Sequence, residues 1–296
     1  MIRRPPRSTL DRSSAASDVY KRQFLNQFQV PVYSTPLTKN FIDFKLGGKN
    51  RHNLFRVNFY ESYKLGEFEF QFFPVCHSIP DSAGILIKTE VASLVHTGDF
   101  KFDDKPTIGD PINTKYLSSL SSKKNLILCS DSTYAEKPGY TDSESVLNAN
   151  LEVIIKNAQG RVLIATFSSL LSRVQQVINI SSKLNRKVVV VGRSMIRNLN
   201  FALDAGYVLD PKSTVISLKE STNLNDDEIV LITTGAQGEV NSAMGLISTM
   251  RHNDVQIQRG DTVVISSSPI PLSLIHISEP TRRYAISYAV FCLKKK

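Results

Sequence analysis

The chain has 296 residues, and its 36 lysines and arginines outnumber its 27 aspartates and glutamates, giving a formal net charge of +9. Such an excess normally suggests an anionic partner. Here it is confined to the ends, because residues 1–23 and 272–296 each carry a net charge of +4, whereas residues 24–271 hold 25 basic and 24 acidic side chains. The charge therefore indicates neither a nucleic-acid nor a membrane partner.

The two ends are related as DNA rather than as protein. Residues 18–23 read DVYKRQ, and the codons GAT GTG TAT AAG AGA CAG would encode them. Their reverse complement encodes LSLIHI, which is the sequence of residues 272–277. Both ends also resemble translated adapters of transposase-based sequencing libraries. We therefore predict that residues 1–23 and 272–296 are adapter-derived and disordered, and we exclude them from the fold. The alternative is a pair of native basic tails.

Residues 24–134 are dominated by strand-like runs. EFEFQFFPV, GILIKT and VASLVHTGDF follow one another at short spacing, with turn residues between them. Cys76 and Cys129 have no paired spacing, so a disulfide framework is not indicated and a reducing cytosol fits. No uncharged apolar run within residues 24–271 approaches the length that spans a membrane. Residues 24–134 are predicted to belong to one domain.

Residues 135–271 have a different pattern. The continuous apolar runs RVLIATF, KVVVVG, EIVLITTG and DTVVISSS read as buried strands. Stretches of helical period lie between them, namely SSLLSRVQQVINISSKL, RSMIRNLNFALDAGYV and AQGEVNSAMGLISTMR. In the first of these, Leu170, Val174, Val177 and Ile178 share a face. The alternation predicts an α/β fold with a parallel, doubly wound sheet.

Small polar residues follow each of these four strands. They are Ser168 and Ser169, residues 192–194, residues 233–235 and residues 266–268. In an open α/β sheet the carboxyl ends of the strands line the ligand crevice. The serines suit helix N-caps, and the same positions also suit binding of a phosphate or a sugar. Both interpretations stay open from the spacing alone.

A histidine and an aspartate follow two strands of the first domain. His77 comes directly after an apolar strand, and Asp99 ends another, with Gly98 allowing close backbone approach. Zinc takes imidazole nitrogen and carboxylate oxygen as ligands. The alternatives are a structural histidine and a turn-forming aspartate. His96 is a weaker candidate, because it should point to the opposite side of the strand from Val95.

The motifs HSIPDS, HTGDFKFD and SDST, together with ATFSSL, VVVVGRSM, TTGAQGE and SSSPIP, cover nearly all of residues 24–271. In this order they resemble the ribonuclease J family, in the β-CASP branch of the metallo-β-lactamase superfamily. The resemblance implies part of an αββα metallo-β-lactamase domain at residues 24–134 and a truncated β-CASP domain at residues 135–271.

The resemblance also assigns roles. It implies His77 as a ligand of one zinc, Asp99 as a catalytic carboxylate that bridges two zincs, and Asp131 as the acidic residue that supports the active site. Ser168 matches the serine that helps hold the 5′-monophosphate of single-stranded RNA, although SSLLSR departs from the family pattern after its first serine. The family implies a cytoplasmic, homo-oligomeric, zinc-dependent 5′–3′ exoribonuclease and endoribonuclease of RNA maturation and decay, with no membrane partner.

Two parts of the expected site are missing from the sequence. The HxHxDH metal motif that should precede these residues does not occur, and neither does the late histidine motif expected after SSSPIP. We therefore predict that this chain neither holds two zincs nor cleaves RNA. Two alternatives to a truncated ribonuclease stay open. One is an RNA-binding β-CASP module without catalysis. The other is a small-molecule hydrolase of the metallo-β-lactamase type, but such an enzyme would leave the second domain without a purpose.

Overall fold

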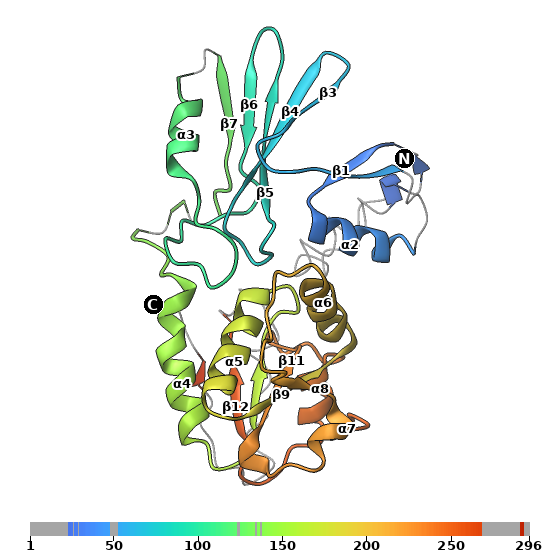
Figure 1. The fold of residues 1–296 in the computed structure, drawn as a ribbon, viewed down its shortest axis with the longest axis vertical. Helices are drawn as coiled ribbons and strands as arrows, with labels where there is room; N and C mark the ends of the chain where they lie inside the picture. The colour runs from blue at the N-terminus through green and yellow to red at the C-terminus, as the bar shows by residue number, and fades with distance from the viewer. Residues whose placement is uncertain are drawn as a thin grey trace.

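The computed structural model describes residues 23–25, 27–28, 30–47, 53–122, 125–133, 135–136, 138–267 and 291–292. The predicted adapter segments therefore lie outside the described residues, apart from Gln23 and the short strand β13 (Phe291–Cys292). Figure 1 shows two units, with one sheet at each end of the molecule.

The first unit contains a five-stranded sheet in the order β3-β4-β5-β6-β7. Its strands are β3 (Ser62–Leu65), β4 (Phe68–Pro74), β5 (Ala83–Lys88), β6 (Ser93–His96) and β7 (Leu126–Cys129). The first four pair antiparallel, and β6 and β7 pair parallel. Helix α3 (Thr114–Leu120) covers one face, where Phe73, Leu86 and Val95 are buried against Leu120. The three strand-like runs correctly predicted β4, β5 and β6.

A small element joins this unit to the second one. It consists of β1 (Val32–Ser34), α2 (Pro36–Lys45) and β2 (Leu54–Arg56), with β1 and β2 paired parallel. The buried carboxylate of Asp81 accepts the backbone N–H groups of Leu37 at 2.6 Å and of Thr38 at 3.3 Å. It thereby supplies the cap that Thr35 does not give to the first turn of α2.

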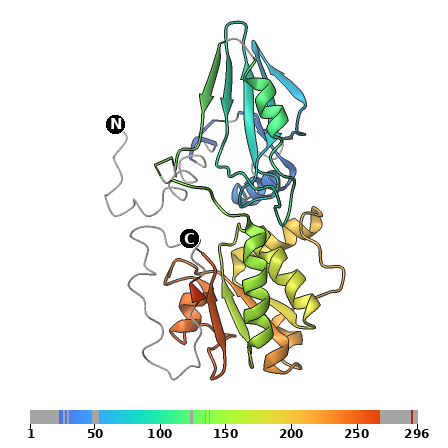
Figure 2. The same cartoon turned by 90° about the vertical axis from the view of Figure 1, so that its left-hand side faces the viewer.

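The second unit is a parallel sheet in the order β10-β9-β11-β8-β12-β13. The strands are β8 (Val162–Ala165), β9 (Lys187–Val191), β10 (Val215–Ile216), β11 (Ile229–Thr233) and β12 (Thr262–Ile265), besides β13. The inner strands β8 and β11 are buried at every residue, because helices lie on both faces (Figure 2). This confirms the predicted α/β class and the parallel, doubly wound sheet.

Two apolar cores hold these helices to the sheet. On one face lie α4 (Leu147–Asn157), α5 (Leu171–Lys183) and α6 (Arg193–Asp204), whose buried side chains meet those of Ile164 and Ile232. On the other face lie α7 (Leu218–Ser221) and α8 (Ala243–Ser248), packed on Leu163 and Leu231. Two short 3₁₀ turns, η3 (Glu144–Val146) and η4 (Asp226–Glu228), precede α4 and β11.

The helix predicted over AQGEVNSAMGLISTMR is too long. Only α8 is helical, beginning after its N-cap Ser242, whose hydroxyl accepts the backbone N–H of Gly245. Residues 236–241 form turns instead, because Gly235 and Gly238 have φ values of +114° and +75°. Such values interrupt a right-handed helix.

Candidate functional site

His77 lies in the loop that follows β4, beside the loop that carries Asp99. The backbone N–H of Lys101 donates to the carbonyl of Cys76 at 2.9 Å, so the two loops are tied together next to these candidates. Although His77 is at the surface, the surrounding protein lowers the pKa of its imidazole, while the charges of Asp99 and Asp131 oppose that shift. The imidazole is therefore neutral at neutral pH, as a metal ligand must be.

Asp99 is exposed and lies in the loop three residues after the end of β6, close to the strand end where it was expected from the sequence. The preceding Gly98 has φ +62°, and a Cβ placed on it would lie 3.0 Å from the carbonyl oxygen of Ala83. Only glycine fits both conditions. His96 is exposed while Val95 is buried, so the two point to opposite sides as predicted, and His96 Nδ1 accepts the backbone N–H of Gly98 at 3.0 Å.

Asp131 follows β7, the neighbour of β6. Its Oδ1 accepts the hydroxyl of Thr133 at 2.7 Å and the backbone N–H of Thr133 at 2.9 Å, and these bonds are the main cause of its lowered pKa. Its own backbone N–H donates to Thr97 Oγ1 at 3.0 Å. The structure thus places His77, Asp99 and Asp131 on three adjoining loops at one end of the first sheet.

These side chains do not complete a metal site. His77 and Asp99 are donors that zinc accepts, but catalytic zinc sites take three protein ligands and structural sites take four. Within the described ranges, no group of three or more His, Cys, Asp or Glu side chains is arranged to hold a metal ion. The residues present therefore do not fit a dinuclear centre by themselves, and no catalytic step through zinc follows from them.

The second candidate region is the end of the sheet at which the parallel strands have their carboxyl termini. Strands β9, β11, β8 and β12 are neighbours, so the polar residues that follow them share one edge of the sheet. The backbone N–H groups of Thr166 and Ser266 donate to Thr233 and Ala165, at 2.9 and 2.8 Å, which holds these strand ends together. Ser268 lies outside the described residues. This carboxyl end is where a doubly wound sheet is expected to form its ligand-binding crevice.

The N-cap interpretation is wrong for the serines after β8 and β9. Helix α5 begins after Leu170 and α6 after Gly192, and neither helix has a side-chain cap. The carbonyl of Ser168 instead accepts Asn198 Nδ2 at 2.9 Å, which fixes the backbone of the loop. The hydroxyl of Ser168 is consequently not used to cap a helix.

The two candidate regions meet directly. The backbone N–H of Leu171, at the start of α5, donates to the carbonyl of Ser78 at 3.3 Å. Ser78 follows His77, and Leu171 lies three residues after Ser168. The predicted metal-side loop and the predicted phosphate-side loop are therefore in contact, although they belong to different units and lie about 90 residues apart in the sequence.

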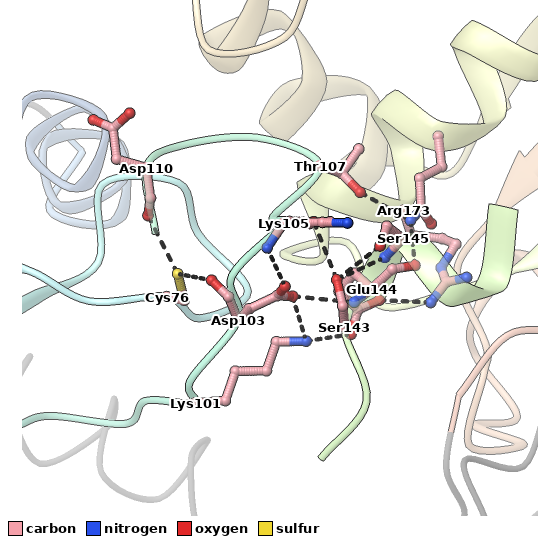
Figure 3. A network of polar contacts seen from close by, with 11 residues as sticks. Cys76, Lys101, Asp103, Lys105, Thr107, Asp110, Ser143, Glu144, Ser145 and Arg173 are labelled. Carbon is pink, nitrogen blue, oxygen red and sulfur yellow. Dashed lines mark hydrogen bonds and ion pairs between the residues drawn. The ribbon is translucent and has the colours of Figure 1, made fainter. Parts of the chain in front are cut away.

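Sequence reasoning missed a buried network of charges beside this contact (Figure 3). Lys101 Nζ lies 3.1 Å from both Asp103 Oδ2 and Glu144 Oε1, and Arg173 Nη2 lies 2.8 Å from Glu144 Oε2. Asp103 and Arg173 are each only 3% exposed. Burial alone would raise the pKa of Asp103, but hydrogen bonds from Ser143, from backbone N–H groups and from Lys101 outweigh it and lower the pKa to about 2.

A small cavity adjoins the network. It has a volume of about 20 Å³ and is lined by Cys76, His77, Lys101 and Asp103, among others. This is enough room for one water molecule. Burial raises the pKa of the Cys76 thiol, and the thiol donates to the carbonyl of Asp110 at 3.3 Å. The neighbourhood of His77 is therefore polar but closely filled.

Comparison with known protein families agrees with the architecture. Residues 159–280 match the family described as ribonuclease J, beta-CASP domain. The chain carries a ribonuclease J β-CASP domain. Over 83% of this chain, the ribonuclease J of Helicobacter pylori (strain ATCC 700392 / 26695) is 38% identical, and the ribonuclease J2 of Bacillus subtilis (strain 168) is also 38% identical. The ribonuclease J of Mycobacterium tuberculosis (strain CDC 1551 / Oshkosh) is 39% identical over 79% of the chain.

The chain spans 36% of the H. pylori protein, 45% of the B. subtilis protein and 40% of the M. tuberculosis protein. Among solved structures, a protein of unknown function from Enterococcus faecalis V583 matches with a TM-score of 0.53 and 16% identity. The match covers 79% of this chain and 56% of that one. At this identity the likeness supports the fold alone. No helix in the described part of the chain is long and apolar enough to cross a membrane.

Proposed function

We propose that this chain is the RNA-binding part of a metal-dependent ribonuclease. In this proposal the β-CASP domain holds the 5′-monophosphate of single-stranded RNA at Ser168, and the loops of His77, Asp99 and Asp131 receive the RNA backbone. The contact between Ser78 and Leu171 is the observation that carries the proposal, because it joins these two regions into one site. Unstacked RNA strands expose both their phosphates and their bases to such a site.

Asp131 and Asp99 have separate roles in this proposal. Asp99 lies in an exposed loop, and its carboxylate would be a ligand of the catalytic metal if the site were complete. Asp131 is restrained by Thr133 and therefore supports the site rather than moving within it. We further propose that zinc is the metal, and that the intact enzyme is a cytoplasmic homo-oligomer, as the family resemblance implies.

By itself, the chain is expected to bind RNA without hydrolysing it. Fewer than three metal ligands come together in the described residues, and activation of a hydroxide by two metal ions requires a complete site. This also keeps an RNA-binding module without catalysis as the second candidate. Incubation of the chain with RNA and added zinc should release no product, and cleavage at a rate proportional to chain concentration would contradict this expectation.

The binding proposal is tested with two oligoribonucleotides of one sequence, one 5′-monophosphorylated and one with a 5′-hydroxyl, each labelled at the 3′ end. Fluorescence anisotropy at low salt gives the affinity of the chain for both. Ser168→Ala should weaken binding of the phosphorylated strand about ten-fold, the value of one hydrogen bond to a charged group. Binding of the hydroxyl strand should not change.

Ser182→Ala is the matched control. Ser182 lies at the opposite end of α5, about 16 Å along the helix from its first residue. This variant should bind both strands as the parent chain does. Equal weakening of both strands by Ser168→Ala, or no weakening at all, would refute the assignment of Ser168 to the phosphate.

A further inference from the structure

The buried charges near His77 connect the two units. Lys101 and Asp103 belong to the segment after β6, which also carries Asp99, whereas Glu144 lies on η3 and Arg173 on the first turn of α5. The alternating positive and negative groups form one continuous chain across the junction (Figure 3). The ion pair between Lys101 and Glu144, together with the hydrogen bond from the backbone N–H of Glu144 to Asp103, links the two units.

Hydrogen bonds to backbone groups fix the orientation of these side chains at the junction. Asp103 Oδ2 accepts the backbone N–H of Glu144 at 3.1 Å, and Asp103 Oδ1 accepts that of Lys105 at 3.0 Å. Gln176 Nε2 donates to the carbonyl of Glu144 at 2.7 Å and to Thr107 Oγ1 at 2.9 Å. Arg173 and Gln176 lie on one face of α5, three residues apart, so the helix is held at two points.

Another contact between the units is apolar. Phe41 and Phe44 of α2 pack against Phe201 of α6 at ring-centroid distances of 5.8 and 6.3 Å. Figure 1 places α2 on the opposite side of the molecule from α4, which follows η3. Apolar contacts tolerate sliding, whereas charge-assisted hydrogen bonds between buried groups fix distance and angle. The charged side of the junction is therefore the side that sets the geometry.

We propose that Lys101, Asp103, Glu144 and Arg173 form an interdomain latch that positions the loop of His77 and Asp99 against the start of α5. Buried ion pairs are weak sources of net stability, and a specific geometry is the benefit that this network provides. Lys101 neutralises two carboxylates at once, and Arg173 orients the second of them. These four are positioning residues, because none of them is assigned to the RNA or to a metal.

The latch is tested by the distance distribution between two spin labels. The labels are placed at Val91, in the turn between β5 and β6, and at Val153 on α4, which are 76% and 58% exposed. Both become cysteine in a Cys129→Ser, Cys292→Ser background. Glu144→Gln and Asp103→Asn should widen the distribution roughly two-fold, because relative motion of domains is the default without a stiff interface.

Asp261→Asn is the matched control. Asp261 is 2% exposed and pairs with Arg161 through two hydrogen bonds of 2.9 and 2.7 Å, but both residues belong to the second unit. It should lower stability without widening the distribution. If Glu144→Gln does not fold, Arg173→Lys keeps the charge with a shorter reach and should widen the distribution less. An unchanged width in the latch variants, or equal widening by Asp261→Asn, would overturn the proposal.

A second measurement uses RNA and rests on the proposed function. A 5′-phosphorylated dinucleotide reaches only the Ser168 side, whereas a ten-nucleotide strand reaches both units. Glu144→Gln should weaken the longer strand about ten-fold and leave the dinucleotide unchanged, since linked half-sites lose their combined affinity when their geometry is lost. Equal weakening of both would indicate a structural role only. If the parent chain binds no RNA, the proposed function fails and the spin-label result alone decides the latch.

Discussion

Asp103 links the network to the stability of the chain. Its side chain is fully buried, and its pKa is lowered from 3.8 to about 2. A carboxyl with a lowered pKa stabilises the fold above its unfolded-state pKa, and this stabilisation is lost as the pH falls through the folded-state value. The ionised form of Asp103 should therefore stabilise the chain at neutral pH and cease to do so between about pH 4 and pH 2.

The magnitude follows from the shift. Each pKa unit corresponds to 1.36 kcal/mol, so the ionisation of Asp103 contributes about 2 kcal/mol at pH 7, of which roughly half remains at pH 3. Asp103→Asn removes this contribution and also presents an amide donor to the ammonium of Lys101. The second effect adds a cost that does not depend on pH in this range, since Lys101 stays charged.

Urea unfolding of the parent chain and of Asp103→Asn at pH 7, 5, 4 and 3 separates the two effects. The difference in the free energy of unfolding should be largest at pH 7 and should shrink by about 1 kcal/mol by pH 3. Asp104→Asn is the control, because Asp104 is the exposed neighbour, and its unfolding free energy should stay within about 0.5 kcal/mol of the parent. A difference for Asp103→Asn that is constant from pH 7 to pH 3 would refute the reasoning.

Three further predictions concern packing, thiols and metal. Gly84→Ala should destabilise the chain by about 1–3 kcal/mol in urea unfolding, because the new methyl group overlaps the buried ring of Phe73. Phe73→Leu should relieve part of this loss, so strictly additive losses of stability in the double variant would contradict the mechanism. In a Cys292→Ser variant, a thiol reagent should modify exposed Cys129 rapidly and buried Cys76 only after denaturation, and two rapid thiols would contradict the described burial. After dialysis against zinc, elemental analysis should find fewer than two zinc ions per chain and chelation should not shift the melting temperature, whereas two retained ions would refute the prediction of an incomplete site.

The sequence predicted the second unit well because burial on both faces leaves a simple pattern. Strand β8 reads VLIA and is buried at every residue, because helices cover both faces of its sheet. Helix α4 was missed, although Leu151, Ile154 and Ile155 have helical spacing and pack in the core. The signal was present in that case.

Some residues of the candidate site could also be proposed from the sequence, and others could not. His77 and Asp99 were proposed because each lies shortly after a strand, and such residues can meet at one end of a sheet, whereas Asp131 was proposed from the family resemblance alone. Glu144 and Arg173 could not be found, since they lie 29 residues apart along the chain, and Lys101, which pairs with Glu144 from the other unit, lies 43 residues away from it. In a sequence, such charged residues look like ordinary surface positions.

The sheet of the first unit has a second apolar face, which is partly exposed. Ile85, Ile87, Leu94 and Ile127 share it through the pairing of β5, β6 and β7, and Ile127 is 53% exposed. Antiparallel sheets that face water on one side alternate apolar with polar residues, but GILIKT does not. Tyr33 of β1 covers the neighbouring Phe70, with ring centroids 4.9 Å apart, and nothing comparable among the described residues covers Ile127. Both faces of this sheet are thus composed for burial, which is the composition that a layered αββα domain requires of a sheet lying between a helix and a second sheet.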